Sequence, residues 1–124
     1  MSPVLKAELF QKYPKIFADS FNSSLPPSCG IDCCDGWFRL IERLCHCVQT
    51  VVDEQGEMQH VAEYVKEKFG GLRFYWYVST DRVDALTDLA ESLSCFICEA
   101  CGAPGARITA GWMSTLCAAH RRRP

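Results

Sequence analysis

Four residues near the C-terminal end carry the clearest chemistry in this sequence. Cys98 and Cys101 form a Cys-x-x-Cys pair, and after a spacer of 15 residues Cys117 and His120 form a Cys-x-x-His pair. Two ligand pairs at this separation are typical of structural zinc sites. Zinc takes four tetrahedral ligands, with sulfur at about 2.3 Å and nitrogen at about 2.0–2.1 Å. Because protein would fill all four positions, the spacing predicts one structural Zn²⁺ and not a catalytic ion, which needs a place for water.

The spacer between the two pairs must bring the second pair back to the first. Gly102 directly follows the second sulfur ligand, where a knuckle turn needs a positive φ. Pro104-Gly105 and Ala110-Gly111 are turn signals within the spacer. We therefore expect a small hairpin in a zinc-ribbon or treble-clef-like subdomain. The metal would stabilise a tail that is too short to build a core of its own.

The remaining cysteines do not follow a usual zinc pattern. The chain has nine cysteines, and an odd number cannot pair completely. The first residues lack the basic start and unbroken apolar stretch of a secretory signal, so we expect a cytoplasmic chain with reduced thiols. Cys95 is expected to be a buried thiol at the end of a helix. Free thiols are favoured over a second metal site among Cys29, Cys33, Cys34, Cys45 and Cys47, but that alternative stays open.

Composition limits the class of protein that can carry this metal site. The chain has 124 residues, 48% of them hydrophobic and 23% charged, with a net charge of −2. These values are ordinary for one soluble globular domain. No run reaches 18 apolar residues, which excludes a membrane span, and no strongly basic balance favours general nucleic-acid binding. We expect a single domain over 1–124, with an α+β core at 1–96 and the zinc-binding part at 97–124.

Hydrophobic periodicity predicts the helices of that core. Apolar spacing indicates a helix near 4–13, which Pro14 ends, and a loop follows at 20–36. The strongest helical pattern covers 36–54, with Asp35 as its expected N-cap. Asp81 is expected to cap a further helix that ends near Ser94 or Cys95.

A β-hairpin is expected between the last two helices. Gly70-Gly71 is a two-residue turn signal, and the aromatic segment from Leu72 to Ser79 predicts a strand. Residues 60–69 suit either a helix or a strand that enters the hairpin, and we favour the hairpin. The expected fold is α+β, with helices packed on a short antiparallel sheet.

The sequence has four consecutive aromatic residues, Phe74 to Tyr77, which could contribute both to the core and to an exposed surface. On a strand Phe74 and Trp76 would meet the helices, while Tyr75 and Tyr77 would either cover a second layer or lie exposed. Exposed aromatic residues are typical anchors of protein interfaces. Together with the nearby Lys66, Lys68 and Arg73 they also suit stacking on single-stranded nucleic acid.

A second basic group lies in the C-terminal part of the chain. The terminal Arg121, Arg122 and Arg123 form either a solvated tail or, with Arg107 of the zinc hairpin, a contact to phosphate.

The sequence does not contain a recognisable set of catalytic residues. A nuclease built on a zinc knuckle needs a further histidine as general base. The chain has three histidines: His120 belongs to the zinc pattern, His46 lies within a helix and His60 stands alone. Gly70-Gly71 lacks the Gly-Lys-Ser/Thr signature of a phosphate loop. We expect a protein without catalytic activity.

Three blocks of the sequence carry a resemblance. They read CDGWFRLIERLC, VKEKFGGLRFYWYV and ICEACGAPG with GWMSTLCAAH. Together they resemble, over about residues 5–120, a group of small zinc proteins encoded by phages and prophages. Cys34 stands where that group usually carries glycine before Asp35-Gly36-Trp37, and the segment before the middle block is short.

The resemblance implies a phage-type accessory protein in the bacterial host cytoplasm, without implying an activity. Small phage accessory proteins are often inhibitors of host defence, anti-CRISPR proteins among them. We therefore expect a non-catalytic, zinc-stabilised protein that binds a host protein complex. The alternative is a small nucleic-acid-binding zinc protein.

Overall fold

The fold combines three helices, a three-stranded sheet and a two-stranded hairpin within the described residues. The computed structural model describes residues 1–18 and 30–121. Its elements follow in the order α1 (Pro3–Lys12), β1 (Ile31–Asp32), the 3₁₀ helix η1 (Asp35–Trp37), α3 (Phe38–Gln55), β2 (Ala62–Lys68), β3 (Gly71–Trp76), α4 (Asp81–Ser94), β4 (Ala106–Ile108) and β5 (Ser114–Leu116). The predicted α+β class is confirmed. Among the described helices, none is both long and apolar enough to cross a membrane.

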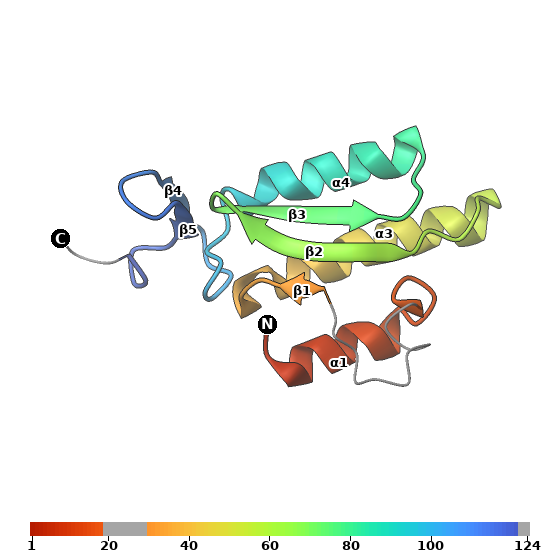
Figure 1. The fold of residues 1–124 in the computed structure, drawn as a ribbon, viewed down its shortest axis with the longest axis horizontal. Coiled ribbons are helices and arrows are strands. Elements are labelled where there is room, and N and C mark those ends of the chain that lie inside the picture. The colour runs from red at the N-terminus through yellow and green to blue at the C-terminus, as the bar shows by residue number, and fades with distance from the viewer. Residues whose placement is uncertain (19–29, 122–124) are drawn as a thin grey trace.

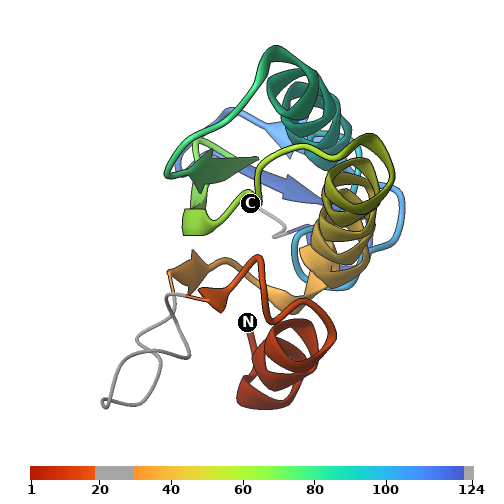
Figure 2. The ribbon, with the colours of Figure 1, turned by 90° about the vertical axis from the view of Figure 1, so that its right-hand side faces the viewer.

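The larger sheet has the order β1-β2-β3, and α3 and α4 lie on the same side of it (Figures 1 and 2). β2 and β3 form the expected antiparallel hairpin, so the segment at 60–69 is mainly a strand. β1 joins β2 in parallel, with Ile31 beside Val65, so the prediction of an antiparallel sheet was wrong at this strand. Parallel pairing requires a long connection, here the whole of α3, and short-range patterns do not reveal it.

The hairpin turn lies one residue earlier than expected. Lys68 pairs with Gly71, which leaves Phe69 and Gly70 as the two turn residues. Both have positive φ, 53° and 79°, as the tight turns favoured in two-residue hairpins require. Gly71 is the first residue of β3, so the prediction of a Gly70-Gly71 turn was wrong by one position.

The helices lie close to their predicted ranges, but two caps differ. Asp35 opens η1 instead of capping α3, and its carboxylate accepts a hydrogen bond from the Ser2 backbone N–H at 2.7 Å. Thr80, and not Asp81, caps α4 by accepting from the Val83 N–H at 3.4 Å. Neither η1 nor α3 has a side-chain N-cap, and the Asp35 carboxylate binds the Ser2 N–H instead, whereas in α4 the neighbouring Thr80 hydroxyl takes the capping position.

The core lies between the sheet and the helices. Trp37 is fully buried, and α3 presents its apolar face to the inner side of β2 and β3 through Ile41, Leu44, Cys45 and Val48. As expected, Phe74 is buried and Trp76 packs against the core, half-buried.

α4 covers the outer edge of β3 with polar groups. The Leu72 and Phe74 backbone N–H groups donate to Ser94 Oγ and Glu91 Oε2, each at 2.9 Å. Trp76 Nε1 donates to Thr87 Oγ1 at 3.0 Å. The unpaired N–H groups of a strand edge can form hydrogen bonds with a strand of another molecule. The bonds from Leu72 and Phe74 to α4 prevent such pairing at the free edge of β3.

A buried carboxylate ties α1 to α3. Glu42 is 8% exposed and accepts hydrogen bonds from Tyr13 Oη at 2.8 Å and Lys12 Nζ at 2.7 Å. Burial by itself raises the pKa of Glu42, but the bonds from Lys12 and Tyr13 outweigh it and hold that pKa below its usual value. The ionised form of Glu42 is therefore the one that stabilises the fold.

Replacing Glu42→Gln should lower the free energy of unfolding by about 1 kcal/mol at neutral pH, because a charge-assisted acceptor becomes a neutral one. Since the pKa of Glu42 is lower in the folded state, its contribution is present at neutral pH and is lost as the pH falls through that value. Urea denaturation of both proteins should show the difference at pH 7 and a progressively smaller difference as the pH is lowered below the usual range of a carboxyl group. A difference that is constant with pH would contradict this account of Glu42.

Candidate metal centre

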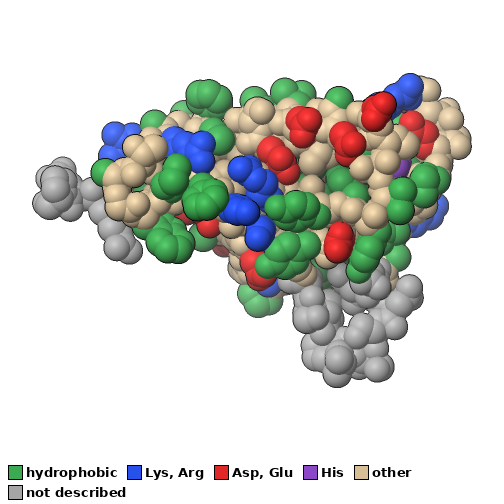
Figure 3. Space-filling view, turned by 45° about the horizontal axis from the view of Figure 1, so that its top comes forward, with side chains coloured by type: hydrophobic (Ala, Val, Ile, Leu, Met, Phe, Trp, Pro, Cys, Tyr) green, Lys and Arg blue, Asp and Glu red, His purple; other side chains and the backbone are tan. Residues whose placement is uncertain are grey.

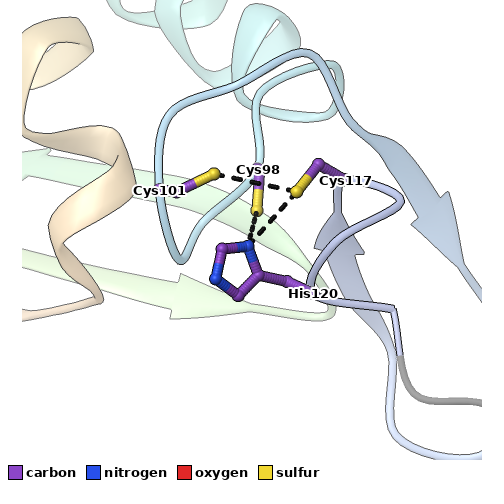
Figure 4. A group of neighbouring side chains, drawn as sticks. All are labelled: Cys98, Cys101, Cys117 and His120. Carbon is purple, nitrogen blue, oxygen red and sulfur yellow. Dashed lines mark hydrogen bonds between the residues drawn. The ribbon is translucent and has the colours of Figure 1, made fainter.

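The four predicted ligands converge at one point (Figure 4). Cys101 Sγ and Cys117 Sγ lie 3.7 Å apart, and His120 Nδ1 lies 3.2 Å from Cys117 Sγ and 3.8 Å from Cys98 Sγ. All the ligand atoms are within 4.8 Å of one another. A tetrahedron with the usual zinc bond lengths has edges of about 3.8 Å between sulfurs and about 3.6 Å between sulfur and nitrogen. The cluster is therefore within reach of a single metal ion, which His120 would bind through Nδ1.

Two tight turns and a hairpin produce this convergence. In the first turn the Gly102 N–H donates to the Cys98 carbonyl at 2.8 Å, and Gly102 has the predicted positive φ, 83°. β4 and β5 then pair antiparallel, with Ala106 beside Leu116, and return the chain to the knuckle. The second turn is closed by the His120 N–H, which donates to the Cys117 carbonyl at 3.1 Å. The hairpin expected from the spacer is confirmed.

Backbone N–H groups of these turns favour the thiolate form of two ligands. Burial raises the pKa of Cys98, but N–H groups of Cys117, Cys101 and Ala100 outweigh it and lower the pKa overall. Cys117 behaves in the same way, with the His120 N–H as the main donor, so its pKa is also lowered. Cys101 has a backbone donor from Ala103 as well, yet burial and the other two sulfurs raise its pKa. The hydrogen bonds of these turns therefore favour the thiolate forms of Cys98 and Cys117, and the thiolate is the form of cysteine that binds metal ions.

The knuckle packs directly against the start of the core helix. The Gly36 N–H donates to the Glu99 carbonyl at 2.8 Å, and Trp37 Nε1 donates to the Ile97 carbonyl at 3.0 Å. A Cβ atom on Gly36 would lie 2.1 Å from the Cys98 carbonyl oxygen, so only glycine allows this approach. Sequence reasoning did not assign this role to Gly36, because the partner lies more than 60 positions away.

The β2–β3 turn makes a second contact with the metal-binding hairpin. Thr115 Oγ1 donates to the Gly70 carbonyl at 2.6 Å, and Arg107 Nε donates to the Phe69 carbonyl at 3.1 Å. A Cβ on Gly70 would come within 3.0 Å of the Ser114 backbone. Arg107, proposed from the sequence as a phosphate contact, is exposed and holds this turn.

Outside the cluster, the described cysteines do not gather around a second site. Cys33 and Cys45 are buried, whereas Cys34 and Cys47 are exposed. Burial raises the pKa of Cys33 to about 12, as expected of an inert thiol. Cys95 is half-buried, so the prediction of a buried thiol was only partly right. Among residues 1–18 and 30–121 the only grouping of three or more potential metal ligands is the one described, and Cys29 lies outside these residues.

The predicted binding residues lie on the side of β2–β3 turned away from α3. We call this surface the outer sheet face, and it carries Tyr64, Lys66, Lys68, Arg73, Tyr75 and Tyr77. Tyr75 and Tyr77 are 40% and 53% exposed, so they do not cover a second layer within the described structure. Tyr64 stacks on Tyr75, with ring centroids 6.4 Å apart, and Lys66 Nζ lies over the Tyr64 ring. On the face shown in Figure 3, Lys and Arg side chains (blue) lie next to hydrophobic side chains (green).

The residues considered for catalysis stay apart from one another. His60 is fully buried, with Nδ1 3.2 Å from the Val78 carbonyl and Nε2 3.3 Å from Glu57 Oε2. His46 is exposed on α3. Arg121 is exposed after the last ligand, and Arg122 and Arg123 lie outside the described residues.

No family model, curated protein or solved structure matches this chain. The geometry of the cluster and of the outer sheet face therefore carries the functional argument.

Replacing Gly36→Ala should lower the free energy of unfolding by about 3 kcal/mol, at the upper end of overpacking costs, because the new methyl group meets the Cys98 and Glu99 backbone. Gly56→Ala is the matched control. Gly56 ends α3 with a φ of 65° and has open space around it, so alanine there should cost only about 1–2 kcal/mol. Urea denaturation measures both, and an equal cost for the two variants would contradict the close approach at Gly36.

Proposed function

We propose that Cys98, Cys101, Cys117 and His120 bind one Zn²⁺ that stabilises the C-terminal hairpin. Support comes from the donor set, because three thiolates and one imidazole are the soft and borderline ligands that zinc prefers. The separations of the ligand atoms also agree with the edges of a zinc tetrahedron. The ion would supply folding free energy to two strands of only three residues each.

We further propose that the protein is a binding module and not an enzyme. Four protein ligands would complete the coordination of zinc and leave no position for a reacting water. The chemistry of the site is then structural, and function falls to the exposed surfaces of the module.

The outer sheet face is the binding surface in this proposal, and its partner is a protein complex of the host. The observation that carries it is the exposure of Tyr75 and Tyr77 on the side opposite the helices. Tyrosine combines a large apolar ring with a polar tip, and it is enriched among the residues that dominate interface energies. Lys66, Lys68 and Arg73 would add electrostatic selection for an acidic partner surface.

The resemblance in the three sequence blocks supports a phage-type accessory role in the bacterial cytoplasm. Inhibition of a host defence complex, as by anti-CRISPR proteins, is the form of that role we propose. This step rests on analogy of size and genomic class and not on a specific residue.

A second candidate function is binding of single-stranded nucleic acid by the same face. The observation in its favour is the Tyr64–Tyr75 stack with Lys66 above the Tyr64 ring. Aromatic platforms flanked by cations are the usual device for holding unpaired bases. The overall charge of −2 weighs against it as the main mechanism.

The metal proposal predicts that the purified protein holds one zinc per chain and that Cys98→Ser loses it. The loss should also destabilise the hairpin, because zinc binding and folding are coupled. Cys95→Ser is the matched control, since Cys95 lies three positions earlier but outside the cluster. Elemental analysis measures the metal, and unchanged zinc in Cys98→Ser would refute the ligand assignment.

The binding proposal predicts that a tagged protein captures one stoichiometric host protein from bacterial lysate, with or without nuclease. The double variant Tyr75→Ala, Tyr77→Ala should bind that protein at least about tenfold more weakly, which is about 1.4 kcal/mol. Val4→Ala is the control, because Val4 is an exposed apolar residue on α1, away from the sheet. Loss of all captured material after nuclease treatment would favour the nucleic-acid candidate, and full binding by the double variant would exclude this face.

A further inference from the structure

Trp112, in the loop at 109–113 between β4 and β5, is 84% exposed and borders two hollows in the surface. The first hollow, of about 410 Å³, lies between this loop and the β2–β3 turn and is also lined by Phe69. The second, of about 580 Å³, lies beside the metal-binding hairpin and is also lined by Leu116 and Arg121. Both volumes are within the range of ligand pockets, roughly 300–1,000 Å³. The Trp112 ring is therefore accessible to a ligand in either hollow.

The packing of the fold does not explain the second aromatic wall, Phe69. Among the residues that the structure describes, Phe69 is the only one other than glycine with a positive φ, 53°. Bulky residues rarely adopt this conformation. The ring is nevertheless 58% exposed, so burial in the core does not offset the strain of the backbone. Strained residues of this kind gather at binding sites.

The first hollow has the features of a site for a flat ring. Phe69 and Trp112 come from two different elements, and Met113 adds a thioether. Lys68 Nζ lies over the Phe69 ring, 5.6 Å from its centroid. Aromatic rings with a cation beside them stack on unpaired nucleobases. An apolar side chain of a protein would also fit there, and the charges around the hollow distinguish these two ligands.

Exposed cations surround the two hollows. Lys68 lines the first and Arg121 the second, and both are exposed. Arg107 is exposed as well, and its bonds to the Phe69 carbonyl hold it beside the first hollow. After Glu99 the sequence contains four arginines and no Asp or Glu. The net charge of −2 is therefore unevenly distributed, and the C-terminal end of the chain is cationic.

The two carboxylates that line the hollows already accept hydrogen bonds from backbone groups. Glu67 Oε1 accepts from the Gly70 N–H at 2.9 Å, and Glu99 Oε2 accepts from the Thr115 N–H at 3.3 Å. Both side chains are half-buried, whereas the cations are exposed. A ligand that approaches this end of the molecule therefore meets a mainly positive surface, which favours an anionic ligand.

We propose that the first hollow binds a base of single-stranded nucleic acid, stacked on Trp112 and Phe69. Lys68, Arg107 and Arg121 bind the adjoining phosphates. A strand that continues past Trp112 meets Arg121 at the second hollow, which takes the next nucleotide. A duplex would bind less well, because its bases are paired and already stacked on one another.

This site adjoins the outer sheet face at Lys68 but does not depend on the protein partner proposed for that face. The stacking side chains come from the β2–β3 turn and the β4–β5 loop, whereas Tyr75 lies within β3 and Tyr77 directly follows it. The two surfaces can therefore be tested by separate variants. Because the site needs a folded hairpin, the zinc-loaded protein is used throughout.

Fluorescence anisotropy of a labelled oligothymidine of about ten nucleotides tests the proposal. The wild type should bind it, with an affinity that falls steeply as salt is raised. Trp112→Ala should bind at least about tenfold more weakly, as expected for the loss of one stacked base. Phe96→Ala is the matched control, because Phe96 is a 69% exposed aromatic residue that lines neither hollow. Both side chains are exposed, so both variants should keep their zinc.

Arg121→Gln tests the phosphate contact separately from stacking. It should reduce the slope of log affinity against log salt by about 0.7, the value for one phosphate of a single strand. Three results would each overturn the proposal: no binding by the wild type at low salt, wild-type binding by Trp112→Ala, or weaker binding only in the Tyr75→Ala, Tyr77→Ala double variant. The first would leave the hollow to an apolar side chain of a protein, and the last would place the nucleic acid on the outer sheet face.

Discussion

Three sulfur atoms and one imidazole nitrogen must meet within a few ångströms, and the fold of the chain from Ile97 to Arg121 depends on that requirement. β4 and β5 have three residues each, too few for an isolated hairpin to be stable in water. The knuckle turn, the hairpin and the Cys-x-x-His turn each bring ligands inward, and their backbone N–H groups lower the pKa of two thiols. A bound ion would turn these weak local preferences into a defined structure.

The same constraint explains where the core and the metal-binding hairpin touch. Gly36 at the start of η1 and Gly70 in the β2–β3 turn are both places where backbone meets backbone without room for a side chain. Gly36 lies in the segment CDGWFRLIERLC and Gly70 in VKEKFGGLRFYWYV, and a third segment, ICEACGAPG, forms the knuckle itself. The blocks are far apart in the sequence but meet at one end of the sheet. Meanwhile the outer sheet face stays exposed, so the surface proposed for binding differs from the contacts that hold the metal-binding hairpin on the core.

Much of the metal site could be predicted because its signals are local. Ligand spacing, Gly102 and the turn residues of the spacer all act over a few positions, as do the apolar periodicities of α3 and α4. The parallel strand β1 could not be predicted, since Ile31 pairs with Val65 across a whole helix. The close approach at Gly36 could not be predicted for a related reason, because the backbone that it contacts, at Cys98 and Glu99, lies far along the chain. The caps differed for two reasons: Asp35 binds the Ser2 N–H, 33 positions away, which local patterns do not reveal, whereas Thr80 and Asp81 are adjacent residues that are both common N-caps.

Hydrogen exchange of the metal-loaded protein, compared with the protein after chelation, tests the central claim most directly. If the ion holds the knuckle and the knuckle is attached to the core at Gly36, then chelation should release the amides of Gly36, Cys98, Glu99 and Gly102, which all bond within this contact. The amides of Leu72 and Phe74, which bond to α4, should keep their protection. Unchanged protection at Gly36 and Gly102 after the metal is removed would contradict the account.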